Sequence, residues 1–234
     1  MSDTAARDAA VASWTALAAE ELRALAWLHA EERGPDVLSA LFASGFPATL
    51  TLVDAAQPTS QAMQAALRAL AAGNEGADGI PCSSADDLAA DFASIYLTYA
   101  LRASPNESVW RDDDHLMLQG PTFAVREFYA RHGIKVPDWR ERADDHLVHE
   151  IEFVAVLLER GEEKEAARFL KTHLLAWLPQ FAARVAQRAA TPFYAALASL
   201  TLASCESCLE RLPRVTVIPP VVAGPDANRL AGCG

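Results

Sequence analysis

Apolar residues recur at helical spacing along most of this chain, and glycines and prolines mark where each stretch ends. Residues 4–31 form the longest such pattern, and Gly34-Pro35 ends it because proline fits the first turn of a following helix. Shorter helices are predicted over 36–43, over 47–55, and from Thr59 or Ser60 to Gly73-Asn74. The longest helix is expected to bury Val11, Trp14, Leu17, Leu22, Leu25 and Leu28.

The second half of the chain continues in the same way. Ser84 and Asp87 have the spacing of a capping box, and helical periodicity follows from Leu88 to Tyr99. Residues 103–107 interrupt the pattern. The next helix runs from about Leu116 to His132 and stops at Gly133. Four more are predicted over 144–159, 162–177, 180–189 and 191–211, with Pro179 expected to kink the chain or restart the helix.

This pattern predicts an all-α fold, an irregular bundle of about ten helices, since no alternation of strands and helices is present. Residues 1–212 are expected to form a single helical domain with a possible hinge at the glycine-rich segment 73–83. Residues 213–234 are proline-rich and are expected to be a mobile tail. Such a hinge permits either a monomer or a domain-swapped dimer.

Composition and charge limit the kinds of molecule that this protein is expected to bind. The formal net charge of −11 argues against nucleic acid and suits a basic partner, although plain solubility explains the charge equally well. No apolar stretch is long enough to span a membrane, and the first residues do not resemble a secretory signal. Four cysteines in 234 residues do not indicate a disulfide framework, so we expect a cytoplasmic protein.

The most informative stretch is 141–159, where titratable residues interrupt an apolar helix. Asp144 and Asp145 are expected in its first turn, where the helix dipole favours acids. His146 and Glu150 lie one turn apart on a broad apolar face, whereas Asp145 and His149 are expected on the opposite, wetter face. Half-buried polar groups need partners, which are either the protein's own backbone or a molecule that docks there.

Catalytic templates are absent, and metal-ligand patterns are weak. The chain has no phosphate-binding loop, no dinucleotide fingerprint, no nucleophile elbow and no H-E-x-x-H. His146, His149 and Glu150 are possible ligands, and Cys205 and Cys208 form a single C-x-x-C on a predicted helix. A helical metal- or redox-binding protein that uses these residues is therefore the alternative interpretation. The acidic cluster Asp112 to His115 is better explained as a solvated helix start or loop.

Four segments in order resemble the TorD/DmsD/NarJ family of molybdoenzyme maturation chaperones. They are Asp91-Phe92-Ala93-Ser94-Ile95-Tyr96, Ser104-Pro105-Asn106-Glu107-Ser108-Val109-Trp110, the helix from Gly120 through Val125-Arg126-Glu127-Phe128-Tyr129 to Gly133, and Asp144-Asp145-His146 with Glu150-Ile151-Glu152-Phe153. In one place the chain departs from the family pattern, because Arg142-Ala143 stands where the family usually has Glu-Pro.

The resemblance implies a cytoplasmic, non-enzymatic protein with no catalytic residues and no cofactor of its own. Family members bind the twin-arginine signal peptide of a molybdopterin oxidoreductase, or its apo form, and hold it for cofactor insertion before export. A purely structural adaptor that binds a partner helix is a further possibility. The residues expected to bind the peptide are Tyr96, Pro105, Glu107, Ser108, Trp110, Asp145, His146 and Phe153.

A twin-arginine leader presents two guanidinium groups followed by a short apolar run. A receptor therefore needs carboxylates for the first part and an apolar groove for the second. Asp145, His146 and Glu107 are assigned to the polar end of the leader, and the aromatic residues and Pro105 to the apolar run. The simpler interpretation is that His146 and Glu150 only tie the 104–115 segment to the helix, and for Glu150 we favour it.

Overall fold

The computed structural model describes residues 2–71, 84–100, 102–137 and 139–216, with side chains from Trp14 onward. Its secondary structure is helical, with one isolated antiparallel bridge between Asn106 and His146, so the predicted all-α fold is confirmed. The predicted hinge at 73–83 and tail residues 217–234 lie outside the described residues. The helices are α1 Ser2–Ala30, α2 Pro35–Ala43, α3 Pro58–Ala71, α4 Ala85–Phe92, α5 Glu107–Arg111, α6 Gly120–Arg131, α7 Leu147–Glu159, α8 Glu163–Phe169, α9 Leu175–Arg188 and α10 Pro192–Arg211.

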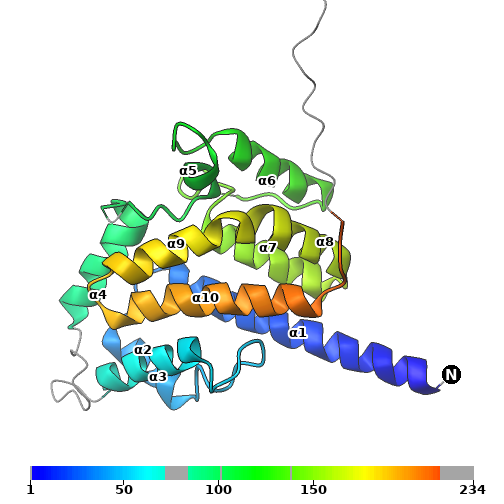
Figure 1. The fold of residues 1–234 in the computed structure, drawn as a ribbon, viewed down its shortest axis with the longest axis horizontal. Coiled ribbons are helices and arrows are strands. Elements are labelled where there is room, and N and C mark those ends of the chain that lie inside the picture. The colour runs from blue at the N-terminus through cyan, green and yellow to red at the C-terminus, as the bar shows by residue number, and fades with distance from the viewer. Residues whose placement is uncertain (1, 72–83, 101, 138, 217–234) are drawn as a thin grey trace, which may run out of the picture.

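The helices pack around α7, α9 and α10 (Figure 1). Helix α1 packs along α7, and α10 packs between α9 and α3, while α2 covers α3. Helices α5 and α6 pack on each other on one side of the bundle, above α9 and α7 in Figure 1. Large apolar side chains fill the space between these layers, among them Phe169, Trp177, Phe181 and Phe193, each buried to 1% exposure or less. Burial of these aromatic side chains, together with the aliphatic side chains of the core, stabilises the bundle.

The face that α1 buries is the predicted one over its second half only. Leu22, Leu25 and Leu28 are fully buried, and Trp14 is partly buried. Leu17 is 44% exposed, so its assignment to the core was wrong. The side chain of Val11 lies outside the described part of the structure.

The helix predicted over 47–55 is absent, because another partner holds that backbone. The backbone N–H groups of Thr51 and Leu52 donate to the two carboxylate oxygens of Glu21 on α1, the second at 2.9 Å. Leu52 and Val53 still reach the core, with 2% and 1% exposure. The segment is therefore a turn fixed by an acid from another helix, which local propensity cannot indicate.

The predicted helix boundaries at Ser84, Gly133 and Gly161 are confirmed. Ser84 Oγ accepts from the Asp87 N–H at 3.1 Å, and the Asp87 carboxylate accepts from the Ser84 N–H at 2.9 Å, which is the capping box. Gly133 and Gly161 have φ angles of 70° and 71°, the left-handed conformation that glycine adopts most easily after a helix. Helix α4 continues into a π-helical turn, Ala93–Leu97, which carries Tyr96.

No new helix starts at Pro179, so of the two outcomes predicted there, a kink or a restart, the restart is wrong. Helix α8, a π-helical turn Leu170–Leu174, and α9 follow one another without a gap. Pro179 lies inside α9. A proline there removes the backbone hydrogen bond to residue 175 and crowds the carbonyl of that residue, and the packing of α9 against α10 maintains the helix despite this cost.

Candidate functional site

Helix α7 begins later than predicted, and its first residues are different. His146 is the N-cap: its side chain accepts from the Val148 N–H at 3.2 Å through Nδ1, and the first helical residue is Leu147. Asp144 and Asp145 therefore precede the helix, and Asp145 is fully buried rather than on a wet face. Both expectations for Asp145 were wrong, because the chain turns inward before α7.

The inward turn occurs because two distant segments pair. Residues 104–108 and 143–147 run antiparallel: the Leu147 N–H donates to Pro105 O at 2.8 Å, and the Glu107 N–H donates to Asp145 O at 3.0 Å. The Asp145 carboxylate then accepts from the Ser108 N–H at 2.8 Å. Asp145 thus holds the start of α5 against the start of α7. We call this arrangement the 104–108/143–147 pairing.

Helix α6 is tied to the same place. Arg126 donates through Nε and Nη2 to Asp144 Oδ2, at 3.1 and 2.7 Å, and the Tyr129 hydroxyl donates to Asp144 O at 3.0 Å. Two motifs that stand about 20 residues apart in the sequence are therefore in direct contact. Their common role is to fix the path of the chain into α7.

Behind the pairing, buried acids form a polar cluster. Glu150 accepts from Trp177 Nε1 at 3.0 Å, and Glu107 accepts from Arg111 and lies 3.1 Å from His173 Nδ1. Burial, followed by the charge of Glu107, raises the pKa of Glu150 well above its ordinary value. Glu150 therefore ties α7 to α9, which agrees with the simpler structural interpretation of this residue.

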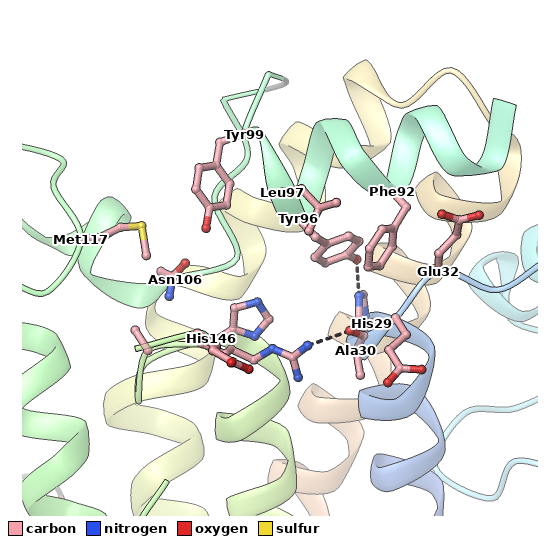
Figure 2. A pocket seen from close by; sticks show the side chains of 14 residues that line it. His29, Ala30, Glu32, Phe92, Tyr96, Leu97, Tyr99, Asn106, Met117 and His146 are labelled. Carbon is pink, nitrogen blue, oxygen red and sulfur yellow. Dashed lines mark hydrogen bonds between the residues drawn. The ribbon is translucent and has the colours of Figure 1, made fainter. Parts of the chain in front are cut away.

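On the outer side of the pairing lies a cavity of about 250 Å³, which we call the acidic pocket (Figure 2). Its lining comes from the end of α1, the end of α4 with the π-turn, and the segments around 106, 117 and 141–146. The residues that give it its character are His29, Glu31, Glu32, Tyr96, Tyr99, Asn106, Met117, Glu141, Arg142 and His146. Three of these are exposed glutamates, while Arg142 donates to Ala30 O at 2.7 Å.

A chain of buried hydrogen bonds fixes one wall of the acidic pocket. Thr201 donates to Leu197 O at 2.8 Å, so its Oγ1 accepts from His29 Nε2 at 2.9 Å. His29 Nδ1 then accepts from the Tyr96 hydroxyl, as the dashed line in Figure 2 marks. Burial lowers the pKa of His29 to about 3, so the imidazole is neutral. His29 of α1 thus links Tyr96 in the π-turn to Thr201 of α10.

Two N–H donors line the floor of the acidic pocket. Because His146 Nδ1 accepts from the backbone, the proton of its neutral ring is on Nε2. Burial lowers the pKa of His146 well below its ordinary value, and Arg142 and His149 act in the same direction. The second donor is Asn106, which is fully buried and whose Nδ2 has no partner among the described residues. Figure 2 places both side chains at the pocket.

A second cavity of about 540 Å³ adjoins the first and shares Tyr99 and Met117 with it. We call it the tryptophan pocket, because Trp110 lies in its wall. The Trp110 Nε1–H donates to Ser104 O at 2.8 Å. Its other lining residues are Arg102, Ser104, Val109, His115, Leu116, Gln180 and Arg184.

Comparison with known proteins shows the family of this chain. Residues 55–183, more than half of the chain, match the family model described as nitrate reductase delta subunit. The chain belongs to this family. The predicted kinship with the TorD/DmsD/NarJ chaperones is confirmed, because this family model matches and relatives of the chain are named TorD and DmsD.

Two relatives of this family illustrate the level of similarity. The chaperone protein TorD of Vibrio cholerae is 34% identical over 146 residues, which are 56% of this chain and 66% of the relative. The Tat proofreading chaperone DmsD of Salmonella typhi is 33% identical over 114 residues, 47% of this chain and 56% of the relative. The alignments thus span just under two thirds of the TorD relative and little more than half of the DmsD relative.

The predicted peptide-binding residues fall into two groups. Tyr96 and His146 line the acidic pocket, and Trp110 lines the tryptophan pocket. The others, Pro105, Glu107, Ser108, Asp145 and Phe153, are buried and line neither cavity. Phe153 packs among Phe128, Tyr129 and Phe169 in the core. The first four belong to the 104–108/143–147 pairing, and Phe153 belongs to the core.

Sequence reasoning missed several lining residues. His29, Glu31 and Glu32 come from the end of α1, which is distant in sequence from the recognised motifs. Asn106 stood inside a quoted motif but was not singled out, because nothing in the sequence shows that its amide lacks a partner. Met117, Arg142 and Arg184 were likewise recognisable only once the segments had been placed together.

The residues of the alternative metal interpretation have other partners. His146 caps α7, Glu150 accepts from Trp177, and His149 lies 3.8 Å from Glu152. Cys205 and Cys208 are buried free thiols, and burial raises the pKa of Cys208 to about 12. Across the described residues, no three His, Cys, Asp or Glu side chains are grouped as metal ligands are.

No helix in the described part is long and apolar enough to cross a membrane.

Proposed function

We propose that this protein is a cytoplasmic, non-enzymatic chaperone for a molybdopterin oxidoreductase. It binds the twin-arginine leader of that enzyme, its apo form, or both, and holds the enzyme for cofactor insertion before export. Family membership supports this role, as does the name of a relative, a Tat proofreading chaperone. The cytoplasm is the proposed compartment because a leader must be bound before the enzyme is exported.

The observation that carries the proposal is the acidic pocket. Glu31, Glu32 and Glu141 give its rim the charge that two guanidinium groups need. On the floor, the N–H groups of Asn106 and His146 match the backbone carbonyl oxygens of an extended peptide. A buried donor without a partner is costly, and a docked carbonyl removes that cost.

The proposed contacts refine the expectation from sequence. Tyr96, His146 and Asn106 touch the bound leader in the acidic pocket, and the rim glutamates attract its arginines. Glu107, Ser108 and Asp145 act through the 104–108/143–147 pairing, which keeps Asn106 and His146 side by side. Pro105 accepts from the Leu147 N–H within the same pairing, whereas Phe153 packs in the core and is not assigned a contact with the leader.

Isothermal titration with the synthetic leader of a molybdopterin oxidoreductase encoded beside this gene tests the proposal. Asn106→Leu keeps the side-chain size but removes the donor, and it should weaken binding about 10-fold, equivalent to one lost hydrogen bond. Glu31→Gln with Glu32→Gln should weaken it about 2- to 5-fold, because exposed charge pairs are worth little.

Glu210→Gln is the matched control. Glu210 is exposed near the end of α10 and lines neither pocket, so this variant should bind the leader like the parent protein. If the parent protein binds neither a leader nor an apoenzyme, the proposal fails. If Asn106→Leu folds and binds with unchanged affinity, the acidic pocket is not the site.

A further inference from the structure

Helix α6 presents aromatic side chains to the outside of the bundle. It buries Val125, Phe128 and Tyr129, and it lies above α9 and α7 in Figure 1. On its other side Phe123 is 55% exposed, and Trp139, which follows α6 in the chain, is 38% exposed. Exposed aromatic side chains contribute little to the core, so their position needs another explanation.

One arginine brings the two exposed aromatic side chains together. The Arg126 guanidinium lies 5.5 Å from the centre of the Phe123 ring and 5.2 Å from the centre of the Trp139 ring. Its hydrogen bonds to Asp144 fix its position, yet the Arg126 side chain is still 39% exposed. Arg140 is exposed as well, with its guanidinium 4.8 Å from the Trp139 ring centre. We call Phe123, Arg126, Trp139 and Arg140 the aromatic surface.

The aromatic surface lies in a basic part of an acidic protein. Residues 120–142 contain five Lys and Arg against three Asp and Glu, whereas the whole chain contains 20 against 31. An arginine held between aromatic rings loses little freedom on binding, and its planar group matches a carboxylate. Aromatic residues and arginine are also the residues that contribute most to protein interfaces. The surface therefore suits a partner segment that carries carboxylates beside apolar side chains.

The position of the aromatic surface indicates which molecule supplies that segment. Trp139 and Arg140 directly precede Glu141 and Arg142, which line the acidic pocket. An enzyme whose leader is held in the acidic pocket keeps the rest of its chain close to this surface. Such tethering raises the effective concentration of that chain, so even a modest second contact is well occupied.

A second copy of this chain fits the aromatic surface less well. In a symmetric dimer the same surface of both copies meets across the two-fold axis. Arg126 and Arg140 of one copy would then face the same arginines of the other, and like charges in contact oppose binding.

We propose that the aromatic surface binds an acidic, partly apolar segment of the mature part of the client enzyme. The acidic pocket holds the leader, and the aromatic surface holds the body of the same enzyme. This inference rests on the proposed function, since it gives the apoenzyme a second contact that is separate from its leader.

Two ligands test the aromatic side chains: the synthetic leader, and the apoenzyme produced without its leader. Phe123→Ser with Trp139→Ser should weaken binding of the leaderless apoenzyme about 10- to 30-fold, as expected when an interface loses its aromatic anchors. Binding of the leader should not change, because neither residue lines the acidic pocket. This unchanged binding also shows that the variant folds. Leu17→Ser, at a residue 44% exposed on α1, is the matched control.

A charge reversal tests the chemistry of the partner. Arg140→Glu should weaken binding of the leaderless apoenzyme about 5- to 10-fold, because the new carboxylate repels the acidic segment. Salt at about 0.5 M should reduce this difference, since exposed charges are then screened. Arg214→Glu, at an exposed arginine beyond the end of α10, is the control. Equal binding by Arg140→Glu and the parent would overturn the assignment of an acidic partner.

Photo-crosslinking identifies the segment itself. A benzophenone amino acid in place of Phe123 should crosslink to the mature part of the full-length apoenzyme, and the captured peptide should be rich in Asp and Glu. Crosslinks to the leader, or to a peptide without acidic residues, would overturn the inference.

The remaining outcomes separate the two proposals. If the parent protein binds neither ligand, the proposed function fails, and this inference fails with it. If the parent binds the leader but not the leaderless apoenzyme, the proposed function stands and this inference is wrong.

Two results with the double variant would also overturn the inference. If this variant loses leader binding and stability together, Phe123 and Trp139 only cover the Arg126–Asp144 ion pair. If light scattering shows that the parent is a dimer and the double variant a monomer, a second copy of the chain covers the aromatic surface.

Discussion

At the scale of single residues, the family-like motifs are held in place mainly by hydrogen bonds across long sequence distances. Asp91, the first residue of one such motif, is buried and accepts from the Ala190 N–H at 3.0 Å and from the Thr191 N–H and hydroxyl at 2.6 and 2.7 Å. It therefore joins α4 to the start of α10. The first residue of this motif therefore has a structural role, while Tyr96 at its end lines the acidic pocket.

Asp91→Ala should destabilise the protein by about 2–4 kcal/mol, because hydrogen bonds to charged groups are strong and two buried donors lose their acceptor. Urea denaturation followed by circular dichroism measures the free energy of unfolding. Asp86→Ala on the same helix is the control, since Asp86 is exposed. A loss of less than about 0.5 kcal/mol for Asp91→Ala, the range of ordinary surface changes, would contradict this assignment.

The lowered pKa of His29 leads to a prediction of how the stability of the protein depends on pH. Its pKa is about 3 in the folded protein, against an ordinary value of 6.5. Between these values the unfolded chain binds a proton that the folded protein does not, so stability falls as the pH is lowered below 6.5. At pH 5 the loss from this residue is about 2 kcal/mol, at 1.36 kcal/mol per pH unit.

Denaturation at pH 7.5 and pH 5.0 measures this loss. His29→Gln keeps polar atoms in the place of the imidazole but does not titrate, so its stability should fall less over this range than that of the parent protein. His115→Gln, which replaces an exposed histidine, should behave like the parent. An unchanged pH dependence in His29→Gln would show that His29 is not the group responsible.

At the scale of elements, the 104–108/143–147 pairing decides where α5 and α7 begin. Helix α5 has only five residues and is too short to be stable alone. Its start is held by the carbonyl and carboxylate of Asp145. The position of Asn106 and His146 in the acidic pocket follows from this pairing rather than from either helix.

Asp145→Ala should cost about 3 kcal/mol, because the buried Ser108 N–H loses its charged acceptor. Asp145→Asn should cost less, since the amide oxygen still accepts that hydrogen bond. Hydrogen exchange should show faster exchange of the Ser108 and Leu147 amides in the alanine variant, together with weaker leader binding. Asp114→Ala, at an exposed acid, is the control. Equal protection in parent and alanine variant would contradict the role given to Asp145.

At the scale of the whole molecule, charge controls association more than it controls folding. The net charge of −11 attracts a cationic leader over a distance that salt shortens, from about 14 Å at 0.05 M to about 4 Å at 0.5 M. The rim glutamates then provide the short-range part of the same attraction. The apolar part of the binding surface is insensitive to this screening.

Raising NaCl from about 0.05 to 0.5 M should therefore weaken leader binding several-fold, mostly through a slower association rate. Surface plasmon resonance separates the two rate constants. A leader whose arginine pair is replaced by glutamine should show a much smaller salt effect. If both leaders respond equally to salt, the arginine pair is not what the acidic surface attracts.

The sequence by itself determined the helical class, most helix ends and the family. Periodic apolar residues, the Ser84 capping box and the glycines at 133 and 161 are local signals, and their meaning does not depend on distant residues. The helix predicted over 47–55 shows the limit of such signals. There the Glu21 carboxylate of α1 accepts hydrogen bonds from the backbone N–H groups of Thr51 and Leu52, and no helix forms.

Only the tertiary structure decided which residues face a ligand. The sequence placed Asp145 on a wet face and Phe153 in a groove, yet both are buried, while Glu31, Glu32 and Asn106 line the acidic pocket. The physical reason is that a pocket is formed by segments that meet in space. The hydrogen bonds that bring residues 104–108 beside 143–147 depend on the packing of α5, α6 and α7, which no local pattern encodes.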